Sequence, residues 1–454
     1  MNKKLKIISF LSVIIIVLGF SVVNIKKSNK PVETKDIEAT VISKSKLTIQ
    51  DKNNVIYTFN ASDIDTSLGA NVLIEYTGLL DKNKQFQDVS IINCETYHVS
   101  NDDDEVPTVW SDNGIFSDFY TLANNKLKTM PLNEKIGQLF LVRYPDTNAI
   151  EDLKKYNLAG YIFFEKDFKN KTENEVKNMI TNLQDAAKIP ILTAVDEEGG
   201  KVVRVSSNTN LVKEEFKSSK ELYNEGGFNL IKDDTIYKSS ILKNLGLNLN
   251  LAPVVDVSTD SSDYIYERTL GENTGLTSTY AKTVIDASMG TGVSYTLKYF
   301  PGYGHNTNTH DEDSIDNRTY EEIRTNDLPP FKAGIDVGAE AILVGHNVVT
   351  SIDNKNPASL SASVHNLLRD NLDFTGIVMT DNLDMWSLSN IDNTVVKAVL
   401  AGNDLIITTD YKSDIAALKT AVSNGTVSEE LIDKLAFRVL AWKYYKGLLF
   451  EITK

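Results

Sequence analysis

The sequence predicts an α/β protein whose main body is a (β/α)8 TIM-like barrel. Short apolar runs rich in Ile, Val and Leu alternate with amphipathic stretches from about residue 113 onward, and polar side chains follow nearly every run. Continuous apolar strands separated by helices are typical of a parallel sheet covered on both faces. An open doubly wound sheet is the competing fold. The barrel is favoured because it would bring the polar clusters together at one face.

Eight apolar runs are predicted to be the barrel strands. They cover residues 137–142, 160–164, 191–195, 247–252, 293–297, 342–344, 376–379 and 405–408. Apolar residues at helical spacing predict the helices that lie between them. The clearest of these helices are expected at residues 173–187, 233–245, 277–289 and 320–337.

A small antiparallel β domain is predicted before the barrel. Residues 38–98 contain several runs in which apolar and polar positions alternate, and turn-prone segments at 51–54 and 81–84 separate the runs. We therefore divide the chain into a leading segment (1–30), a small β domain (31–99), an acidic linker (100–112) and the barrel (113–454). The β domain is either a spacer or a binder of wall polymer, and no aromatic stripe decides between them.

The leading segment predicts a membrane anchor. The nineteen uncharged residues 7–25 follow three lysines and precede Lys26 and Lys27. A helix of this length reaches about 28 Å, close to the thickness of the bilayer hydrocarbon. A cleaved signal peptide is the first alternative, although the small residues of a cleavage site are poorly matched, and a buried helix is the second. We expect the body on the extracytoplasmic face, or secreted if the segment is cleaved.

Charge and cysteine content exclude several classes of function. The net charge is −15, which disfavours nucleic acid as a partner because binding it requires Lys and Arg at the phosphates. Cys94 is the only cysteine, so the sequence excludes an intramolecular disulfide and a cysteine-based zinc site.

Asp381 is the candidate nucleophile. It follows the seventh predicted strand directly, so it should stand on rigid backbone at the barrel mouth. A carboxylate placed there can attack the anomeric carbon of a sugar and form a covalent intermediate. The alternative is that Asp381 caps the next helix. Asn382 and Asp384 are nearby polar alternatives.

His310 is the candidate acid/base. It lies in the loop after the fifth strand, and histidine titrates near neutral pH, so it can protonate a leaving alcohol and then activate water. His305 in the same loop is the rival. A metal site of His305, His310, Asp311 and Asp313 is a third possibility, but the spacing matches no recognised ligand pattern, and no metal is predicted.

Five further side chains are candidate substrate-binding residues: three of them follow predicted strands, and the two arginines are candidates through the family resemblance given below. A carboxylate can accept hydrogen bonds from sugar hydroxyls, and cations can hold hydroxyls or an acyl group. For the two arginines, salt bridging to the abundant acids is the plainer alternative. The five residues are Asp196, Arg204, Arg268, Lys298 and Tyr299.

The order of these motifs resembles family 3 glycoside hydrolases, especially single-domain β-N-acetylhexosaminidases of the NagZ type. The resemblance covers residues 130–444. It begins with a stretch similar to Met-x-x-x-Glu-Lys-Ile-Gly-Gln at 130–138 and continues with Asp-x-Glu-Gly-Gly at 196–200, Arg-x-x-Gly at 268–271, Lys-x-Phe-Pro-Gly at 298–302 and Thr-Asp-x-Leu at 380–383.

The resemblance implies roles for the loop residues. It makes Asp381 the nucleophile and His310 the last member of an Asp-x-His dyad, but here Asn308 stands where the family has the aspartate. Asn308 can still orient the imidazole, although it offers no charge to stabilise the imidazolium. Tyr299 and Tyr303 replace two histidines of the family pattern. Asp256 resembles a mainly structural barrel position.

The implied function is a retaining exo-glycosidase that removes terminal β-linked N-acetylglucosamine from cell-wall-type glycans through a covalent glycosyl-Asp intermediate. No metal or organic cofactor is expected, and we expect a monomer. The alternatives are a β-glucosidase or another exo-glycosidase of the family, or a catalytically weakened barrel that binds wall glycans or a protein.

Overall fold

The computed structural model describes residues 106–107, 110, 112–305 and 314–449, together with five strands between residues 35 and 96. The chain forms two compact units, one of residues 1–105 with 447–454 and one of residues 106–446, and each is described by itself. Within the described residues, no helix is both long and apolar enough to span a bilayer. The predicted anchor at 7–25 lies outside them.

The smaller unit contains one antiparallel sheet of five strands, in the order β3-β2-β1-β4-β5. The register pairs Ile37 with Ile74 across β1 and β4, and Ile74 with Cys94 across β4 and β5. The side chain of Ile74 is fully buried. The strands are β1 (Lys35–Ser43), β2 (Thr48–Asp51), β3 (Ile56–Thr58), β4 (Asn71–Gly78) and β5 (Val89–Thr96).

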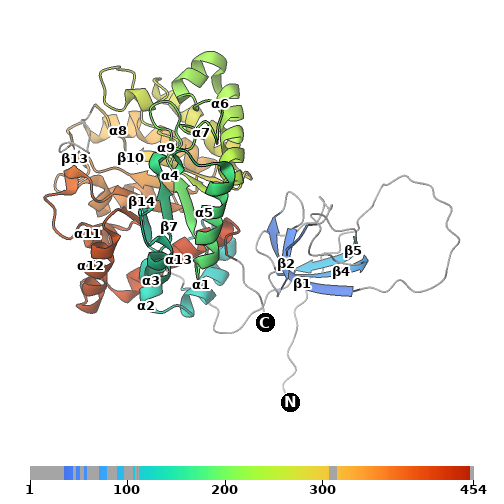
Figure 1. Cartoon of the computed structure of the whole chain (residues 1–454). Helices are drawn as coiled ribbons and strands as arrows, with labels where there is room; N and C mark the ends of the chain where they lie inside the picture. Colours follow the sequence, from blue (N-terminus) through green and yellow to red (C-terminus); the bar gives the residue numbers. More distant parts are fainter. Residues whose placement is uncertain are drawn as a thin grey trace. The chain divides into compact units, whose positions relative to one another are not determined.

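The larger unit is a closed barrel of eight parallel strands (Figure 1), which confirms the predicted barrel. Each strand overlaps one of the predicted apolar runs, and almost every strand residue is buried, because the strands pack against helices on one face and fill the barrel on the other. In order around the barrel from the first strand they are β6 (Phe140–Arg143), β7 (Gly160–Phe163), β8 (Leu192–Val195), β9 (Leu249–Asn250), β10 (Ser294–Phe300), β12 (Ala341–Val344), β14 (Ile377–Asn382) and β15 (Leu405–Thr408).

Helices surround the barrel (Figure 1). Those expected at 173–187 and 277–289 are confirmed as α5 and α7. The longer helices are α1 (Tyr120–Lys128), α3 (Ala149–Tyr156), α5 (Glu173–Ala186), α6 (Ser219–Asn244), α7 (Thr274–Ser288), α9 (Leu328–Asp336), α11 (Thr394–Ala401), α12 (Tyr411–Ser423) and α13 (Glu429–Tyr445). The shorter ones include α2 (Leu132–Gly137), α4 (Glu165–Phe168), α8 (Tyr320–Asn326) and α10 (Ala362–Asn366).

Two sequence predictions about helices were wrong in detail. The single helix expected at 320–337 is two helices, α8 and α9, because Pro329 and Pro330 occupy the first turn of α9, where a missing N–H is tolerated. The helix expected at 233–245 is the second part of α6, which starts at Ser219. Ser218 caps it together with Glu221, and Gly227 interrupts it with a positive φ of 63°.

A buried charge network holds α13 against the amino-terminal ends of β14 and β15. The side chain of Asp404 is 1% exposed, and its Oδ2 accepts hydrogen bonds from Arg369 at 2.7 Å and from the Val378 N–H at 2.8 Å. Arg438 of α13 lies 3.0 Å from the other oxygen of Asp404 and also donates to the Gly376 carbonyl at 2.8 Å. This carboxylate therefore pairs with the partly buried Arg369 and with the buried Arg438, which also pairs with Asp112 at 3.0 Å.

We predict that Asp404→Ala lowers the free energy of unfolding by about 3 kcal/mol, because it removes the buried carboxylate that Arg369 and Arg438 share, while Arg438 keeps Asp112. Urea denaturation followed by circular dichroism measures the loss. Asp392→Ala, at an exposed position, is the matched control and should change little. A similar small effect for both variants would show that the network does not stabilise the barrel.

Candidate active site

The carboxyl ends of four barrel strands carry most of the predicted site residues. Asp196 follows β8 directly, Lys298 and Tyr299 lie near the end of β10, and Asp381 lies in β14. Arg268 ends the short 3-10 turn Tyr266–Arg268 between β9 and α7. Four of these five are linked by direct contacts.

The centre of this cluster is Glu198, which the sequence analysis did not single out. Its carboxylate accepts two hydrogen bonds from Arg268, at 3.0 and 2.7 Å, and forms an ion pair with Lys298 at 2.6 Å. Lys298 also donates to Asp196 at 2.8 Å. The sequence offered one signal for Glu198, its place as the third residue of the Asp-x-Glu-Gly-Gly motif. Three acids follow β8 in succession, so the motif alone does not show which of them binds the cations.

Burial makes these charges interdependent. The side chains of Lys298 and Glu198 are 1% and 6% exposed. Burial by itself raises the pKa of Glu198, but the charges of Arg268 and Lys298 outweigh it and hold the pKa at about 2. Burial also disfavours the charged forms of Lys298 and Arg268, yet the carboxylates beside them raise both pKa values. All three groups are therefore charged at neutral pH.

Tyr299 presents a neutral hydroxyl to the site. Its oxygen accepts a hydrogen bond from Arg268 at 2.5 Å, which leaves its own O–H free to donate. Burial raises the pKa of Tyr299 to about 12; Arg268 and Lys298 oppose the rise, and the nearby Asp381 carboxylate adds to it. The Tyr299 hydroxyl is thus a hydrogen-bond donor at a position where the family pattern has histidine.

The carboxylate of Asp381 is held by the backbone of the next residue. Its Oδ1 accepts a hydrogen bond from the N–H of Asn382 at 2.7 Å. The carbonyl of Asn382 lies 2.9 Å from Nε2 of His346, which follows β12, is buried and also contacts Ser359 at 2.7 Å. The carboxylate that the sequence marks as nucleophile is therefore partly exposed on rigid backbone.

Arg204 lies apart from this charge cluster. Its guanidinium carbon is 5.4 Å from the centre of the Phe164 ring, one nitrogen donates to the Val203 carbonyl at 3.2 Å, and Nε is buried without a partner among the described residues. The neighbouring acid, Glu197, accepts backbone N–H groups of Arg204 and Val205 at 2.8 and 2.6 Å. It fixes this loop and does not pair with the arginine side chain.

Asp256 supports the backbone at the end of β10. It accepts the N–H groups of Tyr299, at 3.1 Å, and of Tyr303. Burial raises its pKa to about 6, even though these hydrogen bonds favour the charged form. Its contacts are with backbone, so it shapes the segment that carries Lys298 and Tyr299.

His310 and Asn308, the predicted acid/base and its partner, lie outside the described residues. His305 is described, and its Nδ1 lies 2.7 Å from Oδ1 of Asp263 in the loop after β9. Among the residues that the structure describes, no group of three or more His, Cys, Asp or Glu side chains is arranged to hold a metal ion.

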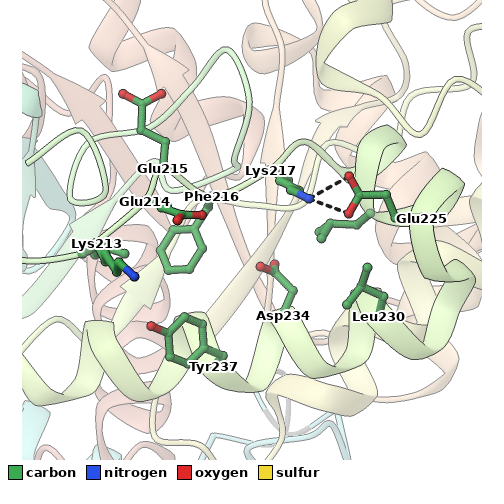
Figure 2. A pocket seen from close by; sticks show the side chains of 11 residues that line it. Lys213, Glu214, Glu215, Phe216, Lys217, Glu225, Leu230, Asp234 and Tyr237 are labelled. Carbon is green, nitrogen blue, oxygen red and sulfur yellow. Dashed lines mark hydrogen bonds and ion pairs between the residues drawn. The ribbon is translucent and has the colours of Figure 1, made fainter. Parts of the chain in front are cut away.

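A pocket of about 410 Å³ lies beside the site, between residues 212–217 and α6 (Figure 2). It is lined by Phe216, Asp234 and Tyr237 and closed by an ion pair of Lys217 with Glu225 at 2.5 Å. None of the predicted site residues lines it. Buried Lys238 connects its wall to the site, because its ammonium lies over the Phe216 ring, pairs with Asp234 at 3.2 Å and donates to the Glu198 carbonyl at 3.2 Å.

We predict that Glu198→Gln lowers the free energy of unfolding by about 3 kcal/mol at pH 7, since the pKa of this carboxyl falls from 4.5 to about 2 on folding. A lowered folded pKa gives stability that is full above the unfolded pKa and is lost as pH falls through the folded one. The difference from wild type should therefore shrink between pH 5 and pH 2, as urea denaturation can measure. A difference that does not change with pH would contradict this assignment.

Comparisons with known proteins agree with this geometry. The sequence model described as glycosyl hydrolase family 3 N terminal domain matches residues 131–442. A β-hexosaminidase of Xylella fastidiosa is 28% identical over 303 residues, which cover 65% of this chain and 88% of that protein.

Two solved structures are also similar. A family 3 β-N-acetylglucosaminidase from a Paenibacillus species matches with a TM-score of 0.66 and 28% identity, covering 72% of this chain and 65% of its own. A family 3 member from Mycobacterium smegmatis matches with a TM-score of 0.63 and 25% identity, covering 69% of this chain and 98% of its own. The chain belongs to glycosyl hydrolase family 3 and is a glycosidase.

Proposed function

We propose that this glycosidase releases terminal β-linked N-acetylglucosamine from cell-wall-type glycans with retention of configuration. The proposal is supported by the arrangement of charged side chains at the mouth of the barrel. Asp381 lies on β14. A cluster of carboxylates and cations lies on the strands and loops from β8 to β10 and consists of Asp196, Glu198, Arg268 and Lys298. Such a cluster can bind sugar hydroxyls while the free carboxylate attacks.

In the proposed mechanism, Asp381 attacks the anomeric carbon while a proton is delivered to the departing oxygen. The resemblance to the family assigns that proton transfer to His310, with Asn308 orienting its ring. Water then attacks the glycosyl-Asp intermediate, and the same imidazole takes its proton. Asp196 with Lys298, and Tyr299 with Arg268, would hold the sugar ring during both steps, and Arg204 would border the same site.

The choice of N-acetylglucosamine is supported by the relatives. The similar Xylella protein is named a β-hexosaminidase, and the similar Paenibacillus structure is titled a β-N-acetylglucosaminidase. A wall-type glycan follows from the proposed extracytoplasmic location. A β-glucosidase is the nearest substitute, because the same cluster can bind a plain 2-hydroxyl. A different alternative is a catalytically weakened barrel that binds glycans without turnover, because Asn308 stands where the family has an aspartate.

We predict that the full chain, purified in detergent, releases a chromogenic phenol from β-N-acetylglucosaminide faster than from the matching β-glucoside. Asp381→Asn should lower kcat on the order of 10³-fold or more, because the amide cannot form the covalent intermediate. Asp392→Asn is the matched control. Asn308→Asp should raise kcat by about 10-fold through the restored charge, whereas His310→Ala should lower it.

Two results would contradict this function. Equal or faster turnover of the plain glucoside would move the assignment to a β-glucosidase. Tight binding of the sugar by calorimetry, with no turnover in the wild type or in Asn308→Asp, would favour the binding protein.

We also propose that residues 7–25 anchor a monomeric enzyme on the extracytoplasmic face of the membrane. Expressed as the full chain, the protein should stay in the membrane fraction at high salt and should be cut by protease added to intact spheroplasts. A shorter mature chain in the medium would identify a cleaved signal instead.

A further inference from the structure

The pocket between residues 212–217 and α6 has a larger neighbour. This second pocket has a volume of about 580 Å³. Glu215, Phe216 and Lys217 line both pockets, so this short segment forms their common wall. Volumes of about 300–1,000 Å³ are typical of sites for small molecules, and both pockets fall in this range. Two pockets with a common wall can receive successive units of one extended ligand.

A break in α6 shapes the first pocket. Gly227 interrupts the helix with a positive φ of 63°. Leu222 and Glu225 line the pocket from the part of the helix before the break, and Asp234 and Tyr237 line it from the part after the break. Residues three apart lie on one face of a helix, so each part of α6 presents one face to the same space. The pocket is therefore formed by the course of the backbone and not only by surface side chains.

The first pocket combines an exposed aromatic ring with hydrogen-bonding groups. The side chain of Tyr237 is 56% exposed, and its ring centre lies 6.0 Å from that of the buried Phe216, at an angle of 73°. Tyr237 and Asp234 point from α6 toward the segment that carries Phe216 (Figure 2). The CH groups of a sugar ring can pack on an aromatic face, while its hydroxyls need donors and acceptors nearby. These groups together suit a carbohydrate.

The charges of the two pockets favour a neutral ligand. In the first pocket, Lys217 pairs with Glu225 at 2.5 Å, and Asp234 pairs with the buried Lys238 at 3.2 Å. Neither pocket has an excess of lysine, so an anion such as phosphate would find no net positive charge there. The second pocket is lined by equal numbers of ammonium and carboxylate groups, those of Lys201, Lys217, Lys220, Glu215, Glu221 and Glu267.

The second pocket borders the loops that hold the cation cluster. Gly200 and Glu267 line it. Gly200 is two residues from Glu198, and Glu267 precedes Arg268 directly. The N–H of Gly200 also donates to the carbonyl of Phe216 at 2.8 Å, which attaches the common wall of the pockets to the loop of the active site.

We propose that the two pockets form an accessory site for a neutral, N-acetylated glycan and bind sugar units other than the one whose bond is cleaved. This inference rests on the proposed function and extends it from short substrates to glycan chains. Binding at two places of the barrel raises the affinity for a chain that is long enough to reach both. A substrate with a single sugar gains nothing from the accessory site.

The test measures binding of the N-acetylglucosamine tetramer by calorimetry. The protein is the full chain in detergent, with Asp381→Asn to prevent hydrolysis. Adding Tyr237→Ala should weaken binding by about 10-fold, because it removes the exposed ring. Tyr237→Phe keeps the ring, and Ile236→Ala removes an exposed neighbour that lines neither pocket, so each should change the affinity by less than about 2-fold.

A second measurement separates the accessory site from the catalytic one. With Asp381 intact, Tyr237→Ala should keep kcat and KM for a chromogenic β-N-acetylglucosaminide within about 2-fold of the wild-type values, since this substrate has one sugar. Absent tetramer binding, unchanged binding in Tyr237→Ala, or an equal loss in Ile236→Ala would overturn the proposal, as would an equal loss for the one-sugar substrate.

Failure of the proposed function is distinguishable from these results. The wild type would then release no phenol, whereas tetramer binding that depends on Tyr237 would remain. Thermal unfolding midpoints confirm that each variant is folded.

Discussion

The active-site face depends on one buried carboxylate shared by two cations. Glu198 binds Arg268 and Lys298 at the same time. Glu198 lies in the loop after β8, Arg268 in the loop after β9 and Lys298 in β10, so the three residues come from three neighbouring strands of the barrel and their loops. Removing three charges from water costs several kcal/mol per ion, and this cost is offset only when the partners are close and well directed. The contacts of 2.6 to 3.0 Å satisfy that condition and fix the loop positions relative to one another.

The three successive acids after β8 have three different roles, and the sequence alone does not distinguish these roles. Asp196 faces Lys298, Glu197 accepts backbone N–H groups of its own loop, and Glu198 joins the cations. The eight strands could be predicted because a buried strand must be apolar throughout, and the place of Asp381 near the carboxyl end of β14 because it comes directly after such a run. Which partner each of the three adjacent carboxylates takes depends on the loop backbone and on distant residues: Arg268 is 70 residues from Glu198, and Lys298 is 102 residues from Asp196. No local pattern encodes that.

The two ends of the barrel use buried charge differently. At the amino-terminal end of β14 and β15, Asp404 and its two arginines bond mainly to backbone carbonyls and N–H groups, and they hold α13 in place. At the carboxyl-terminal end, the side chains of Asp381 and Asp196 remain partly exposed, and the Tyr299 hydroxyl keeps its proton for a ligand. This agrees with the general division of the fold into a stabilising face and a reactive face.

The order of strands around the barrel separates the cation cluster from Asp381. β8, β9 and β10 are consecutive, whereas β14 is separated from β10 by β12 and from β8 by β15, β6 and β7. The cation cluster and Asp381 therefore stand in different sectors of the barrel mouth. Asp381 keeps its own backbone support on β14, apart from the strands that hold the cluster. Under the proposed function, substitutions in the cluster would change which sugar is bound and would leave intact the backbone that supports the attacking carboxylate.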